Sequence, residues 1–186
     1  MADPSYTLEE GNQFIIACHH DLDGVKQKLA EKPDLAHAFN EEMNESALGA
    51  GGHMGRRDIA EVLLAAGAEM ELATAAMLGK KDTVRAALAE DPANANAVGA
   101  HGIPLAFHAA MSGDVELLEM LWNAGAQDAL KTSLHGAVWH NRLPAARWLL
   151  EHGASVDEKN WQGKTTLEFA EESSLNDMLA VLKEFA

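Results

Sequence analysis

The pattern of apolar and polar positions repeats along the chain. Residues 55–68 and 113–126 follow one pattern, in which a glycine and charged residues precede apolar side chains at helical spacing. A second glycine closes each copy at the same interval after the first. Residues 141–154 repeat the pattern with Asn141 at the first position, and asparagine is the usual substitute for glycine in a left-handed turn. The pattern therefore predicts an amphipathic helix that is bounded by turns and repeated along the chain.

Three weaker copies extend the repetition toward both ends of the chain. Residues 20–33 and 79–92 keep the apolar positions but end in proline, which also stops a helix, and a sixth copy centres on Ser173. A short alanine-rich segment precedes each copy, at residues 14–19, 48–54, 72–78, 105–112, 134–140 and 167–172. We therefore predict six antiparallel helix pairs, in which alanine on the first helix allows close approach of the neighbouring pair.

The chain resembles the ankyrin-repeat family. Residues 132–137 read Thr-Ser-Leu-His-Gly-Ala, which resembles the Thr-Pro-Leu-His-x-Ala opening of an ankyrin repeat. The segment from Gly153 to Leu167 resembles the turn between two such repeats. The resemblance implies an all-α solenoid of about six helix-turn-helix repeats that are linked by β-turn fingers, and a role in binding other proteins.

The resemblance also suggests how the chain is divided. We expect an N-terminal extension at residues 1–12 and a single repeat domain at residues 13–186. The repeats are expected near residues 13–40, 45–68, 70–92, 102–126, 131–154 and 163–186. Successive copies are closely spaced after Gly67 and after Gly125, so the fingers at these two junctions should be missing or stunted. One continuous core is expected to run through the stack.

The net charge of the chain argues against two classes of partner. The 29 acidic residues outnumber the 14 lysines and arginines, which gives a formal net charge of −15. Such a charge repels phosphate backbones and anionic lipid, so neither nucleic acid nor a membrane surface is an expected partner. A single cysteine, Cys18, excludes an internal disulfide and a multi-thiolate metal site. The N-terminus has no basic and apolar leader, and we expect a cytoplasmic monomer.

The resemblance implies that a partner binds the concave face, formed by the finger tips and by the two positions before each first-position glycine. These positions hold methionine, tryptophan and histidine where an idle surface would carry charged residues. The candidate contact residues are His53, Met54, Met77, Met111, Trp139, His140 and Trp161. The alternative is that the first helices lean inward over the missing fingers and bury these side chains against one another. Trp161 could equally pack on its neighbouring finger or contact a partner.

The histidines suggest a second function of a different class. His19, His53 and His140 are placed to face the groove, so a small-molecule or metal-binding protein, or an enzyme, could use them. Repeats stack roughly one helix diameter apart, which puts His140, in the fifth repeat, too far away to join the other two. No zinc-protease, nucleophile-elbow or phosphate-loop motif occurs, so we predict no enzyme activity, no catalytic or metal-ligating residue and no cofactor.

Cys18 and the acidic residues near the first finger each have two possible interpretations. Cys18 beside His19 is either an activated thiol or, more commonly for this residue type, a buried structural one. Glu41, Glu42 and Glu45, with Glu9 and Glu10, form either a solvated acidic surface around the first finger or a contact for a basic partner.

Overall fold

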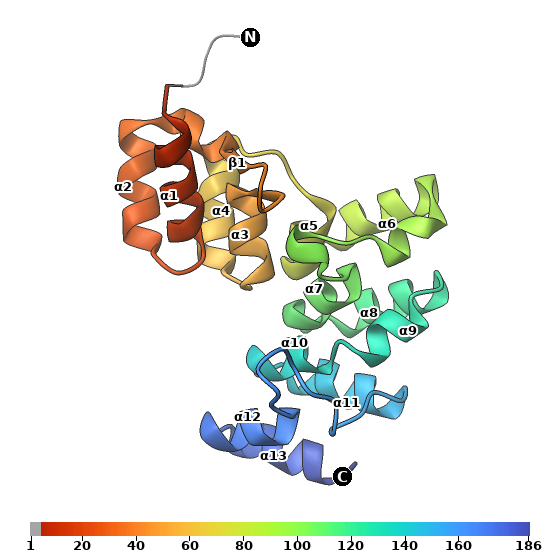
Figure 1. The fold of residues 1–186 in the computed structure, drawn as a ribbon. Helices are drawn as coiled ribbons and strands as arrows, with labels where there is room; N and C mark the ends of the chain where they lie inside the picture. The colour runs from red at the N-terminus through yellow and green to blue at the C-terminus, as the bar shows by residue number, and fades with distance from the viewer. Residues whose placement is uncertain (1–4) are drawn as a thin grey trace.

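The computed structural model describes residues 5–186, and over this range the chain is mostly helical (Figure 1). The α-helices are α1 (Leu8–Cys18), α2 (Leu22–Glu31), α3 (Ala47–His53), α4 (Arg57–Ala65), α5 (Leu72–Met77), α6 (Lys81–Glu90), α7 (Leu105–Ser112), α8 (Val115–Asn123), α9 (Gln127–Lys131), α10 (Leu134–Trp139), α11 (Leu143–Glu151), α12 (Thr166–Glu172) and α13 (Asn176–Lys183). Short 3-10 helices lie at η1 (Pro33–His37), η2 (Pro92–Asn96) and η3 (Ala100–Gly102), and β1 (Phe39–Asn40) pairs with β2 (Glu45–Ser46).

The helices stack as the six predicted pairs. The first repeat is α1 and α2, followed by α3 and α4, α5 and α6, α7 and α8, α10 and α11, and finally α12 and α13 (Figure 1). The turn inside the second repeat contains Gly55 with φ +66°, and Asn141 takes the same left-handed conformation with φ +51° in the fifth. The prediction of an all-α solenoid built from helix pairs is confirmed. Within residues 5–186, no helix has the length and apolar character that a membrane span requires.

The first helix begins earlier than the predicted repeat boundary. α1 starts at Leu8, so residues 8–12 of the expected N-terminal extension are helical, and residues 1–4 lie outside the described part of the chain. The reason is a capping box. The Thr7 side chain accepts a hydrogen bond from the backbone of Glu10, and the Glu10 carboxylate accepts one from the backbone of Thr7.

The fingers are shortened where the spacing predicted. Three junctions carry a finger, closed by the β1–β2 pair, by a bridge between Val98 and Pro104, and by a bridge between Lys159 and Thr165. In the described chain, no bridge follows Gly67, and α5 begins at Leu72. After Gly125 the short helix α9 takes the place of the finger.

The core is divided into two clusters, which corrects the prediction of one continuous core. The larger cluster runs from α5 to α13, and the smaller one from α1 to α4 with Met77, Leu78 and Met111. At one point where α3 meets α5, a Cβ atom on Gly52 would lie 2.4 Å from the hydroxyl of Thr74. A glycine and a threonine hydroxyl therefore interrupt the aliphatic packing at this point.

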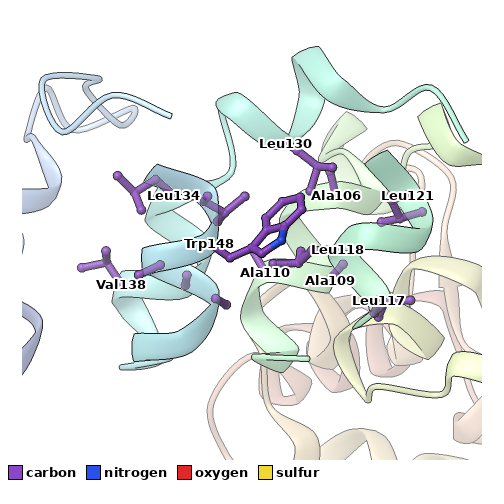
Figure 2. Close-up of a cluster of buried hydrophobic side chains, with 14 of the residues drawn as sticks. Ala106, Ala109, Ala110, Leu117, Leu118, Leu121, Leu130, Leu134, Val138 and Trp148 are labelled. Atoms are coloured by element: carbon purple, nitrogen blue, oxygen red, sulfur yellow. The ribbon is translucent and has the colours of Figure 1, made fainter. Parts of the chain in front are cut away.

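In the larger cluster, alanine-rich first helices pack against apolar second helices, as the sequence pattern predicts. Alanines of α7 face the apolar side chains of α8, and the indole of Trp148 from α11 lies among them (Figure 2). Trp148 is 8% exposed and meets the ring of Trp122 edge-on at 5.8 Å between centroids. Both tryptophans therefore pack in the second-helix layer.

Candidate functional site

A cavity of about 580 Å³ lies between the ends of α3 and α10 and two of the fingers. We call it the aromatic cavity, and its walls are His53, Met54, His101, Ile103, Pro104, Phe107, Trp139 and Trp161. The first helices supply His53, Phe107 and Trp139, while the fingers supply His101 and Trp161. The volume lies within the range of about 300 to 1,000 Å³ that is typical of ligand pockets.

Aromatic rings form one wall of the cavity. Trp139 meets Trp161 edge-on at 4.8 Å between ring centroids and meets Phe107 at 5.7 Å. Trp161 is 77% exposed, so it both packs on a neighbouring side chain and offers a face to solvent. That side chain is Trp139 of α10, not a residue of the next finger. The indole N–H of Trp139 is buried and has no hydrogen-bond partner. The wall thus offers mainly apolar area to the cavity.

Four of the predicted contact residues line this cavity, namely His53, Met54, Trp139 and Trp161. Their burial differs, since Met54 is 45% exposed and Trp139 is half-buried. The structure therefore brings together side chains from the second repeat, the fifth repeat and the finger that follows the fifth. Whether they bind a partner stays a prediction.

Met77 and Met111 do not lie on the surface, and here the prediction is wrong. Each is 2% exposed and packs in the smaller core cluster. The arginines that begin two second helices help to close this region. Arg57 donates a hydrogen bond to the carbonyl of Leu78 at 3.0 Å, and Arg142 donates one to that of Met111 at 3.0 Å. The inward-leaning alternative thus holds for the middle of the stack.

His140 lies outside the aromatic cavity and packs against the second repeat. A Cβ atom on Gly55 would lie 2.2 Å from Cε1 of His140, so the turns of the second and fifth repeats touch. His140 therefore reaches the second repeat, which the spacing of the repeats alone did not suggest, but it does not join His19 and His53. Burial, together with the charge of Arg142, lowers the pKa of His140.

Three histidines surround one buried carboxylate at the edge of the cavity. Oε1 of Glu45 lies 3.0 Å from Nδ1 of His53, 3.1 Å from Nε2 of His101 and 3.5 Å from Nε2 of His19. The rings of His19 and His101 each meet the ring of His53 edge-on, at 4.9 and 5.0 Å between centroids. We call these four residues the histidine cluster. It contains His19 and His53 of the predicted histidines, and His140 is not part of it.

Each member of the cluster is held by a different local structure. His19 caps the C-terminus of α1, His53 is the last residue of α3, and Glu45 lies on β2. His101 has φ +56° within η3, a left-handed conformation that is uncommon outside glycine but that asparagine, aspartate and histidine adopt more often than other residues. Two first helices and two fingers therefore converge on one point.

The electrostatics of the cluster follow from burial and proximity. Glu45 is 1% exposed, so the solvated acidic surface expected on the first finger does not include it, whereas Glu41 and Glu42 are exposed. Burial alone would raise the pKa of Glu45, but hydrogen bonds and charge from His19 and His53 lower it to about 2. The hydrogen bond to Glu45 raises the pKa of His19, which burial opposes.

Cys18 is the buried structural thiol of the two interpretations. Its side chain is inaccessible, and burial together with the negative charge of Glu45 raises the pKa of the thiol to about 12. It is therefore not an activated nucleophile.

Sequence reasoning missed Glu45 and His101 as partners of the groove histidines. Neither belongs to a spaced motif, and they lie 56 residues apart in the chain. The one available signal was position: Glu45 lies in the finger just before the first helix α3, and His101 lies in the finger just before the first helix α7. Whether two such positions meet depends on how the repeats stack.

Comparison with known families is consistent with this geometry. Residues 72–160 match the family described as ankyrin repeats (3 copies). Ankyrin repeats are generally protein–protein interaction modules, and the family is generally non-enzymatic. The helix pairs on both sides of the matched range are of the same kind, so the match and the fold together support an ankyrin-repeat family for the chain.

Proposed function

We propose that the protein binds a partner protein through its concave face, and that the aromatic cavity takes up an apolar side chain of that partner. The observation that carries the proposal is the cavity of about 580 Å³ with Trp139 and Trp161 in its wall. Tryptophan is enriched among the residues that dominate binding energy at protein interfaces. Met54, which also lines the cavity, supplies a flexible apolar contact that adapts to the shape of the partner.

The charge of the chain supports a basic partner segment. A net charge of −15 attracts a positively charged segment over long range and speeds its encounter with the groove. The contributions of the apolar contact and of the charge can be measured separately. The apolar contact sets the lifetime of the complex, while the charge sets the rate of association. We therefore expect a segment that carries one large apolar side chain flanked by lysine or arginine.

The proposal is tested with the full-length protein and two cavity variants, Trp161→Ala and Met54→Glu. Both positions are substantially exposed, so the variants are expected to fold. Each protein is immobilised, and the proteins that it retains from a lysate of the source cell are compared by mass spectrometry. Ile16→Ala, at a residue of α1 that is 55% exposed and outside the cavity, is the matched control.

A protein retained by the wild type is then purified and titrated against the same variants. We expect affinity to fall at least roughly tenfold in Trp161→Ala, with Ile16→Ala unchanged, since truncating an interface anchor costs on the order of 2 kcal/mol. Affinity should also fall as salt is raised. Equal affinity for the wild type and both cavity variants would exclude the cavity as the binding site.

A further inference from the structure

We propose that the histidine cluster, His19, Glu45, His53 and His101, is a binding site for one divalent transition-metal cation, with Zn²⁺ as the first candidate. The proposal is independent of partner binding at the concave face. It rests on the donor atoms, on their hydrogen bonds and on the burial of the carboxylate.

The donor atoms are of the right kind and close enough together. One ligand atom from each of the four residues lies within 4.8 Å of those of the other three. Imidazole nitrogen is a ligand for zinc, copper, iron and nickel, whereas magnesium and calcium prefer sites made of oxygen alone. Three imidazoles and one carboxylate match the nitrogen and oxygen ligands of tetrahedral zinc.

The hydrogen bonding of His19 orients a lone pair into the cluster. Nδ1 of His19 lies 2.9 Å from the carbonyl oxygen of Ile15, and because a carbonyl only accepts, Nδ1 carries the proton. In the neutral ring Nε2 is then an acceptor, and it faces Oε1 of Glu45 at 3.5 Å. Two acceptors that face each other need a proton or a cation between them. Donation of the second ring N–H to a backbone carbonyl is also the usual arrangement of a metal-bound histidine.

The surroundings of the Glu45 carboxylate also favour a bound metal cation. The side chain of Glu45 has no solvent exposure, and its second oxygen, Oε2, is buried without a hydrogen-bond partner. A buried carboxylate needs a compensating positive charge. Among the described residues, its ion pairs are all with histidines, and none is with a lysine or arginine. A divalent cation would supply that charge, and the competing source is a proton on an imidazole.

The site has a path to solvent. The His101 side chain is 38% exposed, and both His101 and His53 line the aromatic cavity. A metal ion held by the cluster would therefore lie at the edge of the cavity, where it is reached from outside without unfolding of the finger.

The test uses the full-length protein after removal of metal with a chelator. Zinc chloride is titrated by calorimetry, and cobalt chloride by visible absorption, which reports coordination geometry. We expect one saturable equivalent of each ion, an intense cobalt spectrum typical of tetrahedral coordination, and a melting temperature that rises with zinc.

Two variants remove ligands and a third is the control. His101→Asn keeps a residue that tolerates the left-handed backbone, so the finger should fold, and Glu45→Gln removes the charge of the carboxylate with little change in shape. His37→Ala removes an exposed histidine outside the cluster. We expect roughly 100-fold weaker zinc binding in the first two variants and no change in the third.

Circular dichroism establishes that each variant is folded, and if Glu45→Gln is not, His101→Asn alone decides. Failure of the wild type to bind one equivalent, or binding that His101→Asn leaves unchanged, overturns the proposal and assigns the charge compensation to protonated histidine. Either outcome is independent of whether a protein partner is retained by the concave face.

Discussion

The imidazole of His140 lies against Gly55, so the second and fifth repeats touch across the concave face. A Cβ atom on Gly55 would approach Cε1 of His140 to 2.2 Å and Nε2 to 2.4 Å. The contact lies beside the ends of α3 and α10, whose residues His53 and Trp139 line the aromatic cavity.

Substituting Gly55 tests that contact. Gly55→Ala should lower the free energy of unfolding by about 1 kcal/mol through its positive φ and by a further 1 to 3 kcal/mol through overpacking against His140. Gly79 has φ +70° in the equivalent turn of the third repeat, but the nearest atom to its Cβ position is 3.9 Å away. Gly79→Ala should therefore show the strain alone. Urea unfolding of both variants measures the difference.

A double variant separates strain from collision. Combining Gly55→Ala with His140→Ala removes the ring that the new methyl group would meet, so the pair should be more stable than the sum of its single effects. Additive single effects would mean that His140 simply moves aside, and that the curvature does not depend on the contact.

The burial of Met77 gives a second prediction. Met77→Ala should lower the free energy of unfolding by about 2 to 4 kcal/mol, because it opens a cavity in the smaller core cluster. Met54→Ala, at a position that is 45% exposed, should cost less than about 0.5 kcal/mol. Thermal and urea unfolding compare the two. Equal and small effects would place Met77 on the surface, as the sequence pattern alone suggested.

His108 makes stability depend on pH. It is 1% exposed, and burial lowers its pKa to about 4 in the folded protein, against 6.5 when unfolded. The unfolded chain therefore binds a proton at this residue between these two values while the folded one does not. The contribution to stability is complete above pH 6.5 and is lost as pH falls toward 4.

The contribution of His108 to the pH dependence of stability is obtained by comparing the wild type with a variant that lacks this histidine. Between pH 7 and pH 5 the wild type should lose about 2 kcal/mol more unfolding free energy than His108→Gln, which cannot take up the proton. Subtracting the two removes the contribution of the other histidines. Parallel pH profiles for the two proteins would show that His108 is already protonated, or solvated, in the fold.

Gly136 tests close approach of two first helices. Replacing a helical glycine with alanine ordinarily stabilises a helix by about 1 kcal/mol. A Cβ atom on Gly136 of α10, however, would lie 2.8 Å from the backbone oxygen of Phe107, so Gly136→Ala should destabilise the protein by about 1 to 3 kcal/mol.

A control glycine lies in α1. At Gly11 the nearest atom is the far end of the Tyr6 ring at 2.9 Å, which can move, so Gly11→Ala should be close to neutral. Stabilisation by Gly136→Ala in thermal unfolding would mean that α7 and α10 are further apart than the structure places them.

Much of the fold was predictable because it is local and repeated. The glycine at Gly55 and the asparagine at Asn141 mark left-handed turns, and this requirement acts on single residues whatever surrounds them. Chain length between copies likewise determined which fingers are short, because too few residues remain after Gly67 to form a hairpin. These constraints can be read without knowing how the repeats stack.

The burial of Met77 and Met111 was decided by the tertiary structure. Their register placed them on the concave side, but whether that side faces solvent depends on the curvature of the whole stack. In the structure, the ring of His140 reaches Gly55, and both methionines are buried. The same curvature leaves Met54 and Trp161 exposed at the rim.

The sequence by itself determined the helix pairs, their turns and the apolar side chains of the concave face, because helical periodicity and backbone conformation act over a few residues. Only the tertiary structure decided that His19, Glu45, His53 and His101 meet. Glu45 and His101 lie on two fingers far apart in the chain, and small rotations between successive repeats, summed over the stack, set the distance between them.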